Sequence, residues 1–198
     1  MYGTCVLLLV AGFETTVNAI GNGVLAMLSD PGQWQALCAD PAGLAPLAAA
    51  EALRYDPPVQ RTQRIALETV EVEGQVLHRG ETVATLIGGA NRDPAAYDHP
   101  DRFDQHRDSP AEHLAFSAGI HYCLGKPLAM LELTIALRAL AERMPGLARA
   151  GRIQRRTSTV IRGPIRFPVT AGTTRRTASS PVPAGRDRPQ TRHPDSGS

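Results

Sequence analysis

The stretch FSAGIHYCLGKPLA, residues 116–129, places Cys123 two residues after His121 and just ahead of a segment with helical periodicity. The amide groups and the positive dipole end of a helix's first turn stabilise a thiolate that lies beside them. Cys123 is therefore a candidate ligand or nucleophile. An inert, buried cysteine is the alternative that the residue type alone allows.

Three neighbours of Cys123 shape this predicted site. Gly119 and Gly125 have no Cβ atom, so a flat ligand can approach the backbone closely. Phe116 is placed to shield one side of the sulfur from water. A zinc site is disfavoured, because His121 and Cys123 supply only two ligands and no second CxxC or HxxxH pair completes a tetrahedral set.

The composition is that of one globular domain. Of the 198 residues, 42% are hydrophobic and 20% are charged, which allows a single core of ordinary size. The three cysteines are widely spaced and odd in number, so we expect a reducing cytoplasm rather than a disulfide framework. The apolar run 5–11 has no basic segment before it and is shorter than the ~20 residues that span a bilayer. We therefore predict a cytoplasmic protein with no membrane partner.

The last segment, 173–198, differs from the rest of the chain. It carries five arginines, two aspartates and four prolines, a charge of +3 against +2 for the whole chain. Because it has no aromatic residue, Leu, Ile or Met, it cannot bury enough apolar surface to order itself. We predict one domain over 1–172 and a disordered basic tail, and we favour a solvated tail over one that binds nucleic acid.

Helical signals dominate the first third of the chain. A helix is predicted over 15–28, with a start that lies earlier still. Asp30 followed by Pro31 is typical of an N-cap and a first helical position, and predicts a second helix that runs to residue 39. A third helix is predicted over 44–55, where an Asp-Pro-Pro sequence ends it.

The remainder mixes β-structure, loop and one more helix. Segment 61–89 is rich in β-formers and broken by glycines, which predicts a small antiparallel sheet. Segment 91–115 reads as a long loop, and 162–169 as a terminal strand. A final helix is predicted over 124–143, with one apolar face formed by Leu128, Leu131 and Ile135. The predicted fold class is mainly α with a small antiparallel β-region (α+β).

A second motif is Glu51-Ala-Leu-Arg54. Its glutamate and arginine are spaced i, i+3 on one helix face and can form a bidentate ion pair. The helix around them is apolar, which predicts a buried pair with a further partner. Arg102, in Pro100-Asp-Arg-Phe103, is the candidate for that partner. The alternative is an ordinary surface pair.

A third motif, AGFETT, occupies residues 11–16 in the first predicted helix. A glycine inside a helix costs ~1 kcal/mol relative to alanine, and the small Ala11 and Gly12 leave a groove that a ligand can enter. The hydroxyl of Thr15 can bond to a carbonyl of the preceding turn. Glu14 and Thr15, an acid and an alcohol in a groove, suit proton delivery. The alternative is a glycine kink with a solvent-facing glutamate.

These stretches, in this order, resemble the C-terminal half of a cytochrome P450, a heme-thiolate monooxygenase of the soluble bacterial type. FSAGIHYCLGKPLA is similar to the heme-binding signature, AGFETT to the oxygen-groove motif and EALR to the Glu-x-x-Arg helix. PDRF resembles the segment that supplies the third member of a structural triad, and IRGPIRFPVT the closing strands. The resemblance covers about 6–172, and the implied fold is the heme-side half of that fold.

The resemblance implies a role for each matching residue. Cys123 becomes the proximal thiolate ligand of the iron of heme b, and Glu14 and Thr15 deliver protons to bound dioxygen. The positions implied to contact the heme or its oxygen groove are Ala11, Gly12, Arg64, Phe116, His121 and Gly125, with Arg64 and His121 on the propionates. The implied structural triad is Glu51, Arg54 and Arg102.

The implied reaction inserts one atom of dioxygen into a small organic substrate, with electrons from a ferredoxin or similar donor. One departure from the pattern is Ser117, where glycine is usual: if this position needs a positive φ, a side chain costs roughly 1 kcal/mol.

The resemblance begins inside the family's central helix, so we expect a fragment, half of a split enzyme or a truncated paralogue. The rival hypotheses are a catalytically inactive heme-binding remnant and a cysteine-dependent redox enzyme without heme.

Overall fold

The computed structural model describes residues 2–108 and 112–172. The tail predicted over 173–198 lies outside the described residues. The helices are α1 (Tyr2–Ser29), α2 (Pro31–Ala39), α3 (Pro41–Tyr55), α4 (Ile87–Ala90) and α5 (Lys126–Arg143). Two short 3-10 turns precede α5: η1 (Leu114–Phe116) and η2 (Gly119–His121).

Local capping sets the ends of the first helices. The Asp30 carboxylate accepts the Gly32 N–H at 3.2 Å, with Pro31 in the first turn, so α2 has the predicted bounds. Asp40 accepts the Gly43 N–H at 2.9 Å in the same way. This second cap starts α3 three residues before the predicted position.

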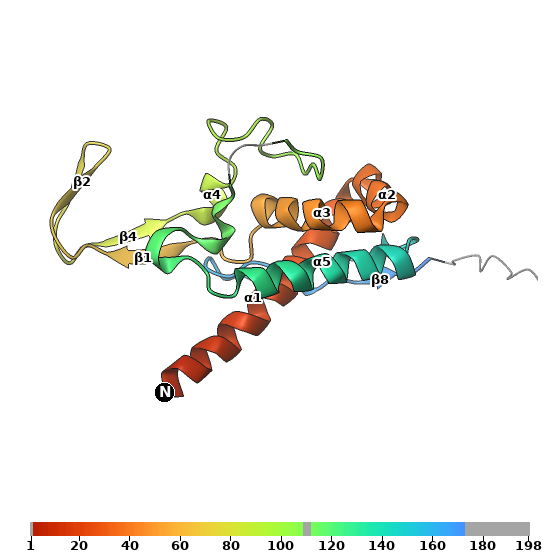
Figure 1. Cartoon of the computed structure of the whole chain (residues 1–198), viewed down its shortest axis with the longest axis horizontal. Coiled ribbons are helices and arrows are strands. Elements are labelled where there is room, and N and C mark those ends of the chain that lie inside the picture. The colour runs from red at the N-terminus through yellow and green to blue at the C-terminus, as the bar shows by residue number, and fades with distance from the viewer. Residues whose placement is uncertain (1, 109–111, 173–198) are drawn as a thin grey trace, which may run out of the picture.

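The strands form antiparallel pairs, as predicted for segment 61–89, but not one sheet. Instead β1 (Thr62–Ile65) pairs with β4 (Thr82–Thr85), and β2 (Val70–Val72) pairs with β3 (Gln75–Leu77) in a separate hairpin. This hairpin projects away from the helices (Figure 1).

The predicted terminal strand is also two short strands. They are β7 (Pro164–Arg166) and β8 (Val169–Thr170), which pair with β6 (Gln154–Arg155) and β5 (Ala148–Arg149).

The core lies between α1, α2, α3 and α5. Helices α3 and α5 lie side by side, and the C-terminal part of α1 crosses them (Figure 1). Small residues allow this close approach: a Cβ added to Gly23 would lie 2.9 Å from the Ala52 Cβ. The largest buried apolar side chains of this core include Met27, Trp34, Leu37, Leu53, Leu133 and Leu137.

Helix α5 has two apolar faces, and the predicted one is exposed. Leu128, Leu131 and Ile135 share a face as predicted, but they are 60%, 57% and 56% exposed. The buried stripe instead contains Leu133 and Leu137, which are spaced i, i+4. The apolar face that the sequence predicted is therefore present, but a different face of α5 packs into the core of the described structure.

The first half of α1 also exposes apolar side chains, and it projects from the other helices (Figure 1). Among the described residues α1 is the one helix long and apolar enough to cross a membrane by length and composition. The run 5–11 is thus part of a 28-residue helix, so the prediction that it is too short is wrong. Core helices of soluble proteins meet the same criterion, so this feature is weak support for a membrane segment.

Candidate functional site

Cys123 lies between η2 and the first turn of α5, as the sequence predicted. Its N–H donates to the Phe116 carbonyl at 3.0 Å, which closes the loop 116–123, and its carbonyl accepts the Lys126 N–H at 3.3 Å. The Cys123 side chain is exposed. The alternative of a buried cysteine therefore does not hold in the described structure.

Glycines keep the space near the sulfur open. Gly125 is the N-cap of α5, and a Cβ added there would lie 3.8 Å from Cys123 Sγ. Gly119 has φ +64°, a conformation that favours glycine, and no atom lies within 4 Å of an added Cβ. His121, at the end of η2, is exposed on the same loop.

Ser117 has φ 63° and ψ −163°, so this position does have the positive φ that makes a side chain costly. The region is almost confined to glycine, and a side chain there costs about 1–3 kcal/mol. The Ser117 hydroxyl accepts a hydrogen bond from Arg64 Nη2 at 3.3 Å. Arg64, on β1, thus reaches the loop of Cys123 across 53 residues of sequence.

An exposed ion pair lies at the start of α5. Lys126 Nζ is 2.6 Å from Glu112 Oε1 and also hydrogen-bonds to the Tyr122 hydroxyl. The hydrogen bond from Lys126 lowers the pKa of Glu112, and the same bond raises the pKa of Lys126. Glu112 was not predicted from the sequence, because nothing in a loop sequence indicates a partner 14 residues away.

Glu51 and Arg54 form the buried bidentate pair that their apolar helix predicted. Both N–O distances are 2.7 Å, and the side chains are 5% and 3% exposed. Arg54 Nη1 donates to the carbonyls of Asn91 at 3.0 Å and Pro100 at 2.8 Å, while Nη2 donates to that of Arg102 at 3.0 Å. This pair therefore holds three points of the loop that follows α4.

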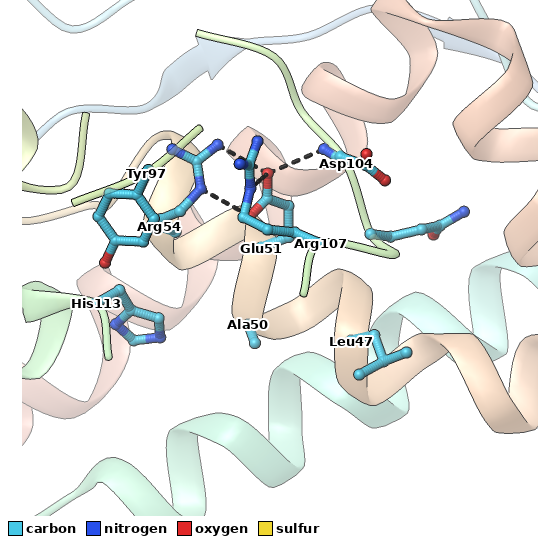
Figure 2. Close-up of a pocket in the computed structure, with 9 residues that line it drawn as sticks. Leu47, Ala50, Glu51, Arg54, Tyr97, Asp104, Arg107 and His113 are labelled. Carbon is cyan, nitrogen blue, oxygen red and sulfur yellow. Dashed lines mark hydrogen bonds and ion pairs between the residues drawn. The ribbon is translucent and has the colours of Figure 1, made fainter. Parts of the chain in front are cut away.

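The third charged member of the cluster is Arg107, not Arg102. Arg107 Nε lies 3.3 Å from Glu51 Oε1, and its side chain is 11% exposed (Figure 2). Arg102 is exposed and contributes only its carbonyl, because the neighbouring Phe103 is buried and packs edge-to-face on Tyr55. Both arginines lie in one loop, so the sequence alone could not show which of them pairs with Glu51.

A pocket of about 130 Å³ lies beside this cluster (Figure 2). Burial raises the pKa of Tyr97 and lowers the pKa of His113, and both residues line the pocket. Ligand pockets for drug-sized molecules measure roughly 300–1,000 Å³, and the acid in this wall, Glu51, is fully engaged by its arginines. The pocket is therefore too small and too occupied by ion pairs to be the main substrate site.

The AGFETT motif lies within the continuous helix α1. Thr15 Oγ1 donates to the Ala11 carbonyl at 2.7 Å, as predicted. Glu14 Oε1 pairs with Arg156 Nη2 at 2.8 Å, so this glutamate is not simply solvent-facing. Gly12 is exposed, and nothing lies within 4 Å of a Cβ added there. Within residues 2–108 and 112–172 no hydrogen bond or ion pair joins this motif to the cysteine loop.

Comparison with known proteins identifies the family. A family model of cytochrome P450 matches residues 46–143, which contain the Glu51–Arg54 pair and the Cys123 loop. The chain is 46% identical over 169 residues to cytochrome P450 140 of Mycobacterium tuberculosis, covering 85% of this chain and 38% of that protein. It is 50% identical over 149 residues to the cytochrome P450 monooxygenase PikC of Streptomyces venezuelae, covering 75% and 35%. The chain belongs to the cytochrome P450 family.

Solved cytochrome P450 structures share its fold. P450BioI, in complex with acyl carrier protein ligated to hexadec-9Z-enoic acid, superposes with a TM-score of 0.80 at 44% identity, over 84% of this chain and 43% of that chain. CYP109E1 of Bacillus megaterium, with corticosterone, gives 0.83 at 35% identity, over 86% and 46%. The predicted fold class, a part of the cytochrome P450 fold that is mainly helical with small antiparallel sheets, is confirmed. The chain spans less than half the length of these relatives.

The residues around Cys123 in this cytochrome P450 chain fit an iron porphyrin. In the described ranges no group of three or more His, Cys, Asp or Glu side chains could hold a metal ion. Ile120 and Leu124 are 98% and 91% exposed on the same loop, an apolar surface that suits a flat macrocycle.

Proposed function

We propose that this chain is the heme-binding side of a cytochrome P450 monooxygenase, in which Cys123 would be the thiolate ligand of heme b. The observation that carries the proposal is the exposed Cys123 sulfur at the start of α5, beside the open backbone of Gly119 and Gly125. When bound, heme with a thiolate ligand supplies the reductive activation of dioxygen that oxygenation of an organic substrate requires.

The chain's own residues would hold the heme from its proximal side and edge. Cys123, just ahead of α5, would supply the sulfur ligand. Arg64 and His121 would supply donors for the heme carboxylates, and Phe116 would shield one side of the Cys123 sulfur.

Glu14 and Thr15 on α1 would deliver the protons that the reaction needs. Thr15 donates its own hydroxyl proton to the Ala11 carbonyl, which leaves the oxygen lone pairs free to accept a proton donor. Glu14, beside it, is held by Arg156. An acid and an alcohol next to the open backbone of Ala11 and Gly12 suit delivery of protons to an oxygen atom.

The buried cluster would act on structure rather than chemistry. Glu51, Arg54 and Arg107 join α3 to the loop after α4, and the Asp104 N–H also donates to Glu51 at 2.9 Å (Figure 2). This loop leads into the cysteine loop, so the cluster keeps the heme side in place.

The partners that complete this function are a small organic substrate, dioxygen and a ferredoxin or similar electron donor. We propose a cytoplasmic protein that binds neither nucleic acid nor membrane, in line with its bacterial relatives.

A second candidate is a chain that binds heme but does not turn over alone, as a remnant or as half of a split enzyme. The exposed apolar faces of α1 and α5 favour it, because they are surfaces that another segment would cover.

The decisive experiment is the absorbance spectrum of the reduced, carbon-monoxide-treated protein. The wild-type chain reconstituted with heme should give the red-shifted Soret band of a thiolate complex, and Cys123→His should abolish it. Cys38→Ser is the matched control and should keep it. Heme binding with the same spectrum in Cys123→His would overturn the assignment.

A further inference from the structure

Ser117 is a strained residue with a specific partner. Its φ of 63° and ψ of −163° lie in a region that is almost confined to glycine, and such outliers persist only where the surroundings hold them. The Ser117 N–H donates to the Leu114 carbonyl at 2.9 Å, and its hydroxyl accepts from Arg64 Nη2 at 3.3 Å. The side chain that causes the strain therefore also makes the contact to β1.

Ser117 connects Arg64 to Cys123 through a short path. The carbonyl of Phe116, the residue before Ser117, accepts the Cys123 N–H at 3.0 Å. The other hydrogen bonds of the Arg64 guanidinium go to Thr62 Oγ1 at 3.2 Å and to the Gln63 carbonyl at 2.9 Å, both on its own strand. Among the described hydrogen bonds of Arg64, the one to Ser117 is thus the one that ties this cation to the cysteine loop.

We propose that Ser117 is a positioning residue whose hydroxyl fixes the Arg64 guanidinium relative to the Cys123 loop. The inference rests on the proposed heme site, because the distance that it fixes is the one between the thiolate ligand and a cation for a heme carboxylate. Glycine at this position relieves the backbone strain but removes the hydrogen bond to Arg64. Alanine keeps the strain and also removes that hydrogen bond. The two substitutions therefore separate the hydroxyl from the backbone.

The test compares Ser117→Ala, Ser117→Gly, Arg64→Met and the double variant Ser117→Ala/Arg64→Met in the heme-loaded chain. The rate of heme transfer to excess apomyoglobin should rise about tenfold in Ser117→Ala, the size expected for a hydrogen bond from a charged group. Ser117→Gly should show the same rise, and it keeps the test available if the alanine variant does not fold. In the Arg64→Met background Ser117→Ala should change nothing further.

The reduction potential of the heme iron supplies a readout that a purely structural role would not move. A cation fixed near the heme favours the reduced iron, so Ser117→Ala and Ser117→Gly should lower the potential in the same direction as Arg64→Met. Glu73→Gly is the matched control: Glu73 is another non-glycine residue with positive φ, 47°, in the turn of the β2–β3 hairpin. It should leave both the potential and the rate unchanged.

Two results would overturn the proposal. One is a wild-type heme-transfer rate in both Ser117 variants, and the other is an equal acceleration by Ser117→Ala with and without Arg64. If the wild-type chain does not form the thiolate spectrum, the proposed function is wrong. Urea unfolding of the heme-free variants then tests the hydrogen bond between Arg64 and Ser117 by itself. If the changes in urea midpoint for Ser117→Ala and Arg64→Met do not add in the double variant, the hydrogen bond is supported. If they add, it is refuted.

Discussion

Arg107 Nε lies 3.3 Å from Glu51 Oε1 (Figure 2). The two oxygens of the same carboxylate also accept hydrogen bonds from Nε and Nη2 of Arg54. One buried carboxylate is thus shared by two guanidinium groups from segments 53 residues apart. Removal of one member leaves the others buried with unbalanced charge, which is the costly case for such clusters.

Arg107→Met should destabilise the chain by about 3–5 kcal/mol, the range for a broken buried ion pair. Arg102→Met is the matched control and should cost no more than about 0.5 kcal/mol, because its side chain is exposed and only its carbonyl is used. Urea unfolding of the two variants measures both values. Equal losses in the two variants would show that the Arg107 side chain contributes no more to the cluster than the exposed side chain of Arg102.

Glu51→Ala should give insoluble or heme-free protein. Without this carboxylate two arginines remain next to each other in a buried site, and the Asp104 N–H loses its acceptor. The measurement is the soluble yield and the ratio of heme to protein after reconstitution. Glu142→Ala, which removes an exposed i, i+4 pair with Arg138, is the control and should behave like wild type. A soluble, heme-loaded Glu51→Ala with the wild-type melting temperature would contradict a buried cluster.

His113 should make the fold sensitive to acid. Burial lowers its pKa below the ordinary value of 6.5, with a smaller lowering by Lys126 and opposing effects of Glu112 and Glu51. The unfolded chain then binds a proton at a pH where the folded chain does not, so this contribution is present above the ordinary pKa and is lost as pH falls through the folded pKa.

The urea concentration at the unfolding midpoint should therefore decrease as the pH is lowered from about 7.5 to about 5.5, the range in which histidine titrates. His113→Asn keeps an acceptor for the Ala115 N–H, which His113 Nδ1 accepts at 3.3 Å, and should flatten that part of the curve. His78→Asn, at a site in an exposed turn, is the control that should not. If the urea midpoint of His113→Asn changed with pH as steeply as that of the wild type, His113 would not be the cause of the acid sensitivity.

The 198-residue chain by itself should not couple electron use to oxygenation. Leu9 and Phe13, next to the Glu14–Thr15 pair, are 74% and 71% exposed, so the described structure does not enclose the motif that would deliver protons. Positioning contributes about 7–11 kcal/mol to such a barrier, and water must be kept from the site. Product formed per reductant consumed, with a competent electron donor, is the measurement.

Supplying an N-terminal half from a relative, in cis or in trans, should raise that ratio. Thr15→Ala in the restored protein should then divert electrons to peroxide, whereas Thr16→Ala, whose hydroxyl bonds to the Gly12 carbonyl at 3.4 Å, should divert fewer. Tight coupling by the chain alone would contradict the need for a second half.

Short-range features of this protein followed from the sequence alone. The bounds of α2 were predictable because Asp30 and Pro31 act within one turn of the helix they start. The Glu51–Arg54 pair was predictable because residues three apart share a helix face. The position of Cys123 before α5 is likewise a local property of the backbone. The positive φ at Ser117 was only a condition at the level of sequence, and the structure decided it.

Long-range pairings were decided only by the tertiary structure. Arg107 rather than Arg102 reaches Glu51, Arg64 meets Ser117 and Arg156 meets Glu14, and each pair joins segments between 53 and 142 residues apart in sequence. No periodicity or capping rule acts over such separations. Helix α5 has two apolar faces for the same reason: its sequence makes both able to pack, and the position of α3 and α1 decides which one is buried.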